Sequence, residues 1–322
     1  MSDDVLAAAR QLAAEADGVP VERVRLLETL SGTWIARGDR VVVKVHPTGT
    51  DPRALAARLR LAAVPELGDC VLAPLRPDPV RVGAAGSTGA WVTVWPRVEP
   101  LPQDVAAVPW AEAGALLARL HLIGVPDLGE RLPAQGSVAR VRASLDRLAA
   151  VVGTGLAPAG LEPAVRIVQD AARRLPAECW TAAGVAGRPR TIVHGDWHLG
   201  QFGRVLDPVA PGEADRWRLI DVDDLGLGDP VWDLARPAGF WAAGLMPDAD
   251  WGEFVHGYRS AGGPALPPVP VDPWPAVDAV ARAGIVLAAA GAVRRAIVRA
   301  GPLEEADARL VEICGRLPDA SW

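Results

Sequence analysis

Two carboxylates and one side-chain amide in the second half of the chain have the types and spacing needed for chemistry on a hydroxyl group. Thr191-Ile192-Val193 predicts a short buried strand, which breaks at Gly195 and leaves Asp196 in a tight polar loop. Gln201 follows this loop, and Asp221 ends a later strand-like run. A loop carboxylate can accept a proton from a hydroxyl, whereas carboxylate and amide oxygens are suitable ligands for Mg²⁺. The pattern therefore indicates a general base beside a metal site.

Kinases use these three groups in this order for phosphoryl transfer. In that arrangement an aspartate accepts the hydroxyl proton, an amide helps to hold magnesium, and a second aspartate bridges the metal to the phosphates. We therefore expect Asp196 to be catalytic and Gln201 and Asp221 to be metal ligands. A solvated loop is the alternative for Asp196 alone, but it does not explain the three groups together.

Several motifs around these residues resemble the aminoglycoside phosphotransferase family. The family's His-Gly-Asp and Ile-Asp segments correspond to His194-Gly195-Asp196 and Ile220-Asp221, and its Gly-Asp-Pro-x-x-Asp-Leu-Ala segment corresponds to residues 228–235. Gln201 stands where the family has asparagine and offers the same amide oxygen on a longer stem. The resemblance implies an α+β, two-lobed protein-kinase-like fold. It places a small five-stranded N-lobe over residues 1–95 and a mostly helical C-lobe over residues 96–322.

The only lysine of the chain lies in a predicted strand of the N-lobe. Lys44 is flanked by valines, so it should alternate to one face of a sheet. The resemblance makes it the lysine that binds the α- and β-phosphates of the nucleotide, and it puts Ser31 and Gly32 in the loop whose N–H groups face phosphate. The alternatives are a lysine that extends from the sheet into solvent and an ordinary turn at Gly32.

The segment Trp95-Pro96-Arg97-Val98 is expected to connect the two lobes. If so, the carbonyl of Trp95 and the N–H of Arg97 or Val98 would contact the adenine edge, because Pro96 has no N–H to donate. A proline-rich linker with no binding role is the alternative.

One part of the kinase pattern is missing. Kinases pair the strand lysine with a glutamate on the next helix, but the predicted helix over 51–63 has no acidic residue between Asp51 and Glu66. Either of these two acids pairs with Lys44 from the helix edge, or the ion pair is absent. The gap and Gln201 together motivate a rival interpretation, a pseudokinase-like protein that binds nucleotide without turnover.

Periodicity and turn residues predict the remaining elements. Within the C-lobe we expect scaffold roles for His121, His194, Asp229 and Asp233, with Asp233 bracing the catalytic loop. The expected strands cover 24–30, 33–37, 40–46, 70–75, 90–95, 201–206 and 217–220, and the expected helices cover 3–17, 51–63, 109–123, 138–152, 161–175, 251–261, 275–298 and 303–317.

Composition narrows the partners and the compartment. A net charge of −6 and a pI near 5.5 disfavour nucleic acid and anionic membranes as partners. The three cysteines (Cys70, Cys179, Cys314) have no metal spacing, and the N-terminus lacks a signal-peptide pattern, so we expect a cytoplasmic protein with reduced core thiols. The absence of a protein-kinase activation segment favours a small-molecule acceptor. Antibiotics and sugars are candidates, since several tryptophans could stack on a sugar.

Overall fold

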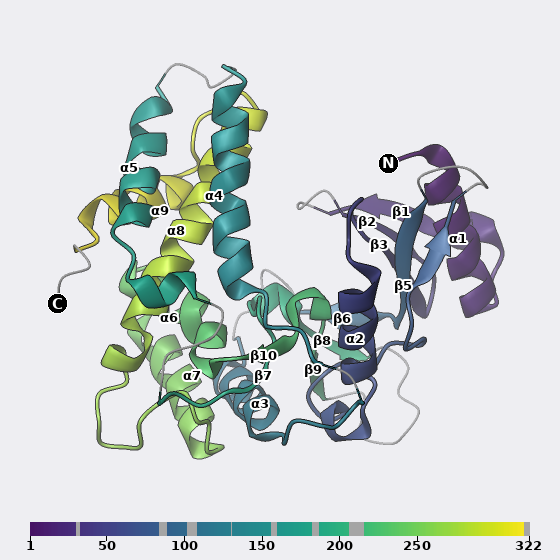
Figure 1. The fold of residues 1–322 in the computed structure, drawn as a ribbon, viewed down its shortest axis with the longest axis horizontal. Coiled ribbons are helices and arrows are strands. Elements are labelled where there is room, and N and C mark those ends of the chain that lie inside the picture. The colour runs from purple at the N-terminus through teal and green to yellow at the C-terminus, as the bar shows by residue number, and fades with distance from the viewer. Residues whose placement is uncertain are drawn as a thin grey trace. The chain divides into compact units, whose positions relative to one another are not determined.

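The chain folds into two compact units, which are described separately. The structure is a computed structural model that describes residues 1–29, 33–83, 89–101, 108–129, 131–155, 160–181, 187–205 and 216–318. The first unit comprises Met1–Val108, Ile123–Pro133 and Leu199–Asp223, and the second comprises Pro109–Leu122, Ala134–His198 and Asp224–Trp322 (Figure 1). These bounds differ from the expected division at residue 95, because β6 (Val98–Pro100) pairs with β8 (Phe202–Val205) and joins the first unit.

A five-stranded antiparallel sheet forms most of the first unit, as expected. Its order is β1-β2-β3-β5-β4, with the bounds β1 Arg25–Glu28, β2 Trp34–Arg37, β3 Val41–Val45, β5 Ala90–Pro96 and β4 Val80–Val82. The expected strand over 70–75 is wrong. Val71 makes only an isolated bridge to Leu219, whose N–H and carbonyl bond to Cys70 and Leu72. The fifth strand is instead the three-residue β4, which pairs with β5.

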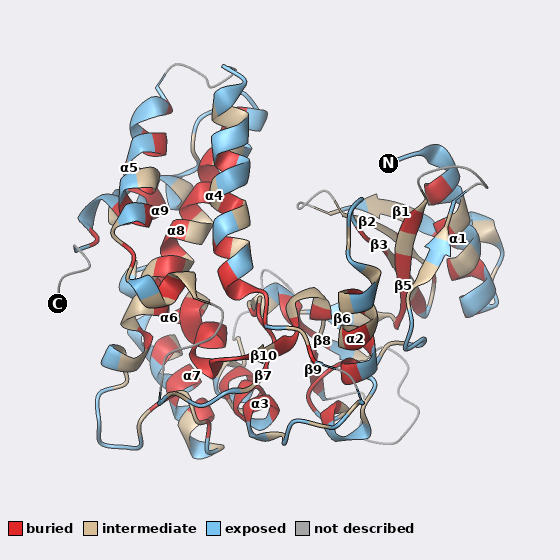
Figure 2. Ribbon diagram, in the orientation of Figure 1, coloured by how far each residue is buried: buried red, intermediate tan, exposed pale blue. Residues whose placement is uncertain are grey.

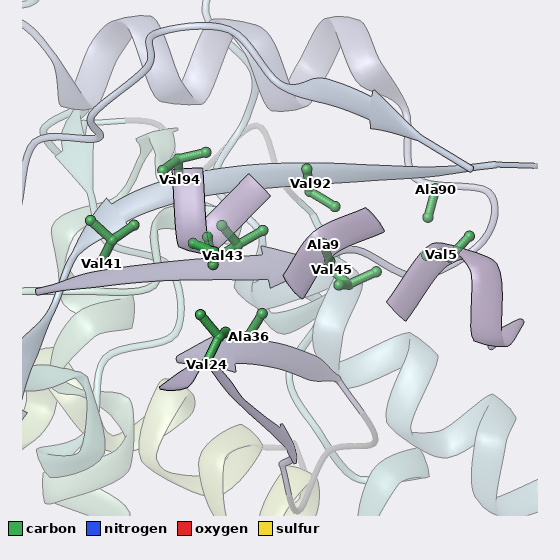
Figure 3. Packing of buried hydrophobic residues seen from close by; sticks show 12 residues of the cluster. Val5, Ala9, Val24, Ala36, Val41, Val43, Val45, Ala90, Val92 and Val94 are labelled. Atoms are coloured by element: carbon green, nitrogen blue, oxygen red, sulfur yellow. The ribbon is translucent and has the colours of Figure 1, made fainter. Parts of the chain in front are cut away.

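One face of this sheet packs against the N-terminal helix α1 (Asp3–Asp17). Residues of β3 alternate in burial, so that Val41, Val43 and Val45 face the helix in a compact hydrophobic cluster (Figure 3). Because neighbouring side chains of a strand point to opposite faces, Lys44 lies on the face away from α1. The apolar core thus fixes the direction of the only lysine.

Two smaller parts complete the first unit. Helix α2 (Pro52–Ala62) begins where Asp51 caps it by accepting the N–H of Arg53 at 2.9 Å. A second antiparallel sheet has the order β6-β8-β9, with β9 at Trp217–Leu219. It positions the residues that immediately follow β9, including Asp221.

The second unit is mostly helical. Its short strands β7 (Thr191–Val193) and β10 (Gly226–Gly228) pair antiparallel and carry the His-Gly-Asp loop at the end of β7. The short helix α6, in which Pro237 and Gly239 obscure the helical pattern, was not expected from the sequence. The helices are α3 (Trp110–Leu122), α4 (Ser137–Gly153), α5 (Glu162–Arg173), α6 (Ala235–Ala242), α7 (Asp248–Ser260), α8 (Trp274–Val298) and α9 (Glu305–Arg316).

Helix α8 is the central helix of this unit. By length and composition alone it could cross a membrane, but more than half of its most apolar 18-residue stretch is buried, and the helix packs against α4, α6 and α9 (Figure 2). Its apolar sequence is therefore explained by its place in the core of the second unit.

Helices α3 and α7 pack unusually closely, because each presents a glycine to the other. A Cβ on Gly257 would lie 1.9 Å from the Ala111 carbonyl oxygen, and one on Gly114 would lie 2.2 Å from the Phe254 carbonyl oxygen. Only glycine fits at these two contacts without a shift of the backbone. The contact orients α3, whose His121 supports the catalytic loop, as described below.

Candidate active site

In the first unit, the ammonium of Lys44 is held by two carboxylates. Lys44 Nζ donates to Asp221 Oδ1 at 2.5 Å and to Asp223 Oδ2 at 2.8 Å, although these residues are far from it in sequence. Only 16% of the Lys44 side chain is exposed. Burial alone would lower the pKa of Lys44, but the charges of Asp223 and Asp221 outweigh it and raise that pKa above 10.5. The lysine is therefore charged at neutral pH.

These contacts show which residues take the place of the glutamate that kinases carry on the helix after the strand lysine. Asp51 is used as the cap of α2, and Glu66 is exposed to solvent. The acidic partners of Lys44 come instead from the segment after β9. Asp223, to which the sequence analysis assigned no role, is one of them.

The two predicted metal ligands lie together beside this lysine. Gln201 Nε2 donates to Asp221 Oδ2 at 3.3 Å, and Gln201 is buried. Asp221 adopts a φ of 64°, a left-handed conformation that few residues other than glycine adopt. Strained backbone of this kind is concentrated at functional sites, where the surrounding structure imposes it. The strain at Asp221 is thus consistent with its predicted role.

The donor set around Asp221 fits magnesium. Mg²⁺ takes oxygen ligands and usually only one or two protein carboxylates, with water filling the other positions. Asp221 supplies a carboxylate, and Gln201, whose amide nitrogen faces that carboxylate, also carries an amide oxygen of the kind that Mg²⁺ accepts. Within the described part of the chain, no group of three or more His, Cys, Asp or Glu side chains is arranged to hold a metal. The described residues therefore do not form a complete metal site from such side chains alone.

A histidine and a threonine line the same face of the sheet. Thr93 lies opposite Lys44, and its hydroxyl oxygen is 2.9 Å from His46 Nε2. Burial lowers the pKa of His46, although Asp223 opposes this, with Oδ2 at 3.6 Å from Nδ1. His46 therefore supports the site as a neutral side chain. The sequence did not identify either residue as functional. His46 lies two residues after Lys44 in the chain, and Thr93 lies opposite Lys44 on the neighbouring strand β5.

The predicted adenine contacts are only partly available. The N–H of Arg97 donates to the Arg40 carbonyl at 2.6 Å, and its guanidinium donates to the carbonyls of Gly38 and Asp39. The Arg97 N–H thus extends the pairing of β5 with β3, and its contact with the adenine edge stays a prediction. Trp95 is buried in β5 and Val98 begins β6, so their proposed contacts stay predictions. Ser31 and Gly32 lie outside the described residues.

In the second unit, Asp233 braces the loop that carries the predicted base. Its two carboxylate oxygens accept the N–H groups of His194 and Gly195, each at 2.8 Å. His121 Nε2 lies 3.0 Å from the same carboxylate, and His121 Nδ1 lies 2.8 Å from the Tyr258 hydroxyl. All these side chains are buried, which confirms the expected scaffold roles of His121, His194 and Asp233.

The sharp turn of this loop requires the glycine at 195. Gly195 has a φ of 85°, and a Cβ there would lie 2.3 Å from the Asp224 carbonyl oxygen. The Ser137 hydroxyl, in the first turn of α4, donates to the Gly195 carbonyl at 2.7 Å. The loop is thus fixed from both sides before Asp196 projects from it.

Two arginines flank the predicted base. Arg140 Nη2 lies 3.0 Å from Asp196 Oδ2, and Arg236 Nη2 lies 3.3 Å from Asp196 Oδ1. Arg140 also pairs with Asp224. Burial raises the pKa of Asp196 above 3.8, and the two guanidinium groups counteract part of that rise. Asp196 therefore lies in a largely desolvated setting, in which two neighbouring cations favour its charged form.

Sequence reasoning missed both arginines. Arg236 directly follows the Asp-Leu-Ala motif, so its place near the loop could have been suspected. Arg140 is one of many arginines, on a helix that reaches the loop only through the tertiary fold. Three of the tryptophans that could stack on a sugar pack on one another instead. The Trp241 ring stacks on Trp251 with centroids 5.4 Å apart, and Trp274 meets its edge.

Comparisons with known proteins point to one enzyme family. Residues 27–274 match the family model described as "Phosphotransferase enzyme family". No curated protein matches the sequence significantly.

Solved structures of small-molecule kinases share the fold. Choline kinase from Cryptosporidium parvum is 9% identical with a TM-score of 0.57, over 98% of this chain and 95% of that one. The choline kinase LicA from Streptococcus pneumoniae is 15% identical with a TM-score of 0.53, over 96% and 97%. Aminoglycoside phosphotransferase APH(3'')-Id from Streptomyces rimosus, in complex with ADP and streptomycin, is 18% identical with a TM-score of 0.51, over 86% and 96%.

These similarities confirm the expected kinase-like α+β fold, with its five-stranded sheet and its helical part. The family match spans well over half of the 322 residues and includes every predicted catalytic and metal-binding position. The chain therefore belongs to the APH phosphotransferase enzyme family, whose members are kinase-like enzymes that act on hydroxyl groups of small molecules.

Proposed function

We propose that this phosphotransferase transfers the γ-phosphoryl group of ATP (or GTP), with Mg²⁺, to a hydroxyl of an antibiotic or a sugar. The observation that carries this proposal is the triad of Lys44, Asp221 and Gln201 in the first unit. A charged lysine beside a carboxylate and an amide is the set of groups that a kinase uses for phosphates and magnesium. The ADP complex of APH(3'')-Id supports a nucleotide as donor.

Asp196 is assigned as the general base. Its carboxylate accepts the proton of the acceptor hydroxyl, whose oxygen bonds to the γ-phosphorus while the bond to the β-phosphate oxygen breaks. Asp233 and Gly195 hold the loop in place, and Arg140 and Arg236 keep Asp196 ionised at neutral pH. Bound magnesium would neutralise charge on the phosphates.

The first experiment is a thermal-shift titration with ATP and with GTP, each with and without Mg²⁺. It is followed by measurement of ADP or GDP formation with a panel of antibiotics, sugars and amino alcohols. The proposal expects a magnesium-dependent rise in the melting temperature and nucleotide consumption that depends on one class of acceptor. Binding without consumption on any acceptor would favour the pseudokinase-like alternative. The direct contact between Lys44 and Asp221 is the reason for testing this alternative, since magnesium would have to compete with Lys44 for the Asp221 carboxylate.

A further inference from the structure

A pocket of about 560 Å³ lies beside helix α7 in the second unit. One wall is a face of α7, and the other is the proline-rich segment that follows the helix, with Leu266, Pro267, Pro268 and Val269. Its volume lies in the range of pockets that bind small molecules, roughly 300–1,000 Å³. The described residues that line it do not include Asp196 or the two arginines beside it, so the function proposed above does not use this pocket.

The lining of the pocket is mostly apolar but carries one permanent positive charge. Val255, Leu266 and the two prolines form much of the apolar part, and Arg259 supplies the charge. His256 Nε2 and Ser260 Oγ, which lie 3.5 Å apart, add two hydrogen-bonding groups. Among the described residues, no aspartate or glutamate lines the pocket. The charge of the lining therefore favours a ligand that carries a negative charge.

The guanidinium of Arg259 is held in place at this pocket. Its Nη2 donates to the Val271 carbonyl at 2.6 Å, which ties the segment after α7 back to the helix. Its Nε–H is buried and has no hydrogen-bond partner in the part of the chain that the structure describes. A buried donor in this state costs free energy unless a further group accepts from it. Arg259 is thus pre-positioned, with hydrogen-bonding capacity that the described chain does not use.

A single arginine in an apolar pocket suits a monoanion. A carboxylate matches a guanidinium group with two parallel hydrogen bonds. A phosphate ester carries more charge and three strongly accepting oxygens, for which Arg259 alone offers too few donors. The apolar walls at Val255 and Leu266 would cover a ring or a branched chain. The pocket therefore fits a small carboxylate with an apolar body.

Helix α7 connects this pocket to the catalytic loop. The residues of α7 that line the pocket recur at helical spacing on one face, at Gly252, Val255, His256 and Arg259. Phe254 and Tyr258 lie on a different face and are buried. Phe254 stacks on Trp197, which directly follows Asp196, with ring centroids 5.4 Å apart. The same helix thus contacts the pocket on one face and the neighbour of the predicted base on another.

A chain of buried hydrogen bonds makes a second connection. In the segment after α7, the N–H of Gly263 donates to the Tyr258 carbonyl at 3.0 Å, and the N–H of Ala265 donates to the Tyr258 hydroxyl at 3.1 Å. The same hydroxyl lies 2.8 Å from His121 Nδ1, and His121 Nε2 lies 3.0 Å from the Asp233 carboxylate that braces the catalytic loop. The wall of the pocket is therefore linked to this loop through Tyr258, His121 and Asp233.

We infer that this pocket is a second binding site of the enzyme, for a small carboxylate with an apolar body, and that its occupancy stabilises the catalytic loop through α7. Arg259 pairs with the carboxylate, and the apolar walls cover the rest of the ligand. The bound ligand favours the arrangement of the segment in which Gly263 and Ala265 hold Tyr258, because it binds that arrangement best. This site goes beyond the proposed function and does not depend on the identity of the acceptor.

Binding is tested without turnover, with benzoate as the probe. Melting temperatures of the wild type are measured in benzoate, in acetate and in benzyl alcohol at constant ionic strength. Acetate lacks the apolar body, and benzyl alcohol lacks the charge. We expect benzoate to raise the melting temperature more than either of the other two compounds. No rise in benzoate, or an equal rise in acetate, would overturn the inference.

The variant Val269→Asp tests whether benzoate binds in this pocket. Val269 lines the pocket and is 74% exposed, so an added carboxylate should leave the fold intact and repel the bound anion. Val298→Asp is the matched control, since this valine is 63% exposed at the far end of α8. In titration calorimetry the Kd for benzoate should rise roughly tenfold or more in Val269→Asp and in Arg259→Met, and stay unchanged in the control. Equal affinities in Val269→Asp and the wild type would overturn the inference.

Hydrogen exchange tests the link to the catalytic loop. Exchange of peptides that cover residues 191–198 is followed by mass spectrometry with and without benzoate. We expect benzoate to slow this exchange in the wild type and in Val298→Asp, but not in Val269→Asp at the same concentration. Binding of benzoate without any change in these peptides would overturn the link. Neither test needs an acceptor, so failure of the proposed function would leave this inference standing, and the reverse also holds.

Discussion

Lys44 Nζ lies 2.5 Å from Asp221 Oδ1, across 177 residues of sequence. The only lysine of the chain is thus held by the residue predicted to bind magnesium. A nucleotide with its metal would have to replace this contact, since the same oxygen cannot serve the metal and the ammonium equally well. The ion pair keeps both groups charged and in position in the absence of ligand.

This relationship predicts the effect of Asp221→Asn. Asparagine tolerates the left-handed backbone at this position but loses the negative charge. We expect the Mg²⁺-dependent part of nucleotide stabilisation to disappear and turnover to fall at least ~100-fold. Thermal shift at increasing Mg²⁺ and steady-state kinetics measure the two effects.

Asp223→Asn is the comparison, because it also weakens the hold on Lys44. It should retain a magnesium response. If both variants lose that response equally, their shared contact with the lysine is responsible and Asp221 is not the metal ligand.

The pH dependence of turnover tests the two arginines at Asp196. Asp196 must be deprotonated to act as base, and Arg236 lowers a pKa that burial has raised. Replacing Arg236 by methionine should therefore raise that pKa further and move the acidic limb of the kcat/KM profile to higher pH by about one unit.

Arg236→Lys keeps the positive charge and serves as the control, with a smaller displacement of the acidic limb. An Arg236→Met profile that superimposes on that of the wild type would show that the guanidinium does not influence the titrating group.

Local motifs explain which parts of this structure the sequence could predict. Alternating apolar residues predict strand β3, and helical periodicity predicts helix α1. Asp196 was identified because it lies in the contiguous His-Gly-Asp motif. The three-residue β4 was missed because so short a run between prolines and glycines lacks a strand pattern. The two acidic partners of Lys44 were also missed, because the kinase pattern places the acid on the neighbouring helix. Arg140 could not be predicted either, because only the tertiary packing brings it to Asp196.

The contact between α3 and α7 gives a prediction on stability with a control on the same helix. Gly257→Ala introduces a methyl group against the Ala111 backbone, so we expect a loss of about 2 kcal/mol or more in the free energy of unfolding. Gly252→Ala on α7 meets no atom within 4 Å and should stabilise the helix by up to about 1 kcal/mol. Urea denaturation of both variants measures the difference. Similar changes of the same sign would contradict the close packing.

The assignment of Asp196 as the base is the central claim. Its most direct test is phosphoryl transfer from γ-labelled ATP by the wild type and by Asp196→Asn, at saturating acceptor and Mg²⁺, with nucleotide affinity titrated in parallel. The account predicts unchanged nucleotide affinity and transfer that is lower by at least ~100-fold. Transfer by Asp196→Asn at the rate of the wild type would contradict it.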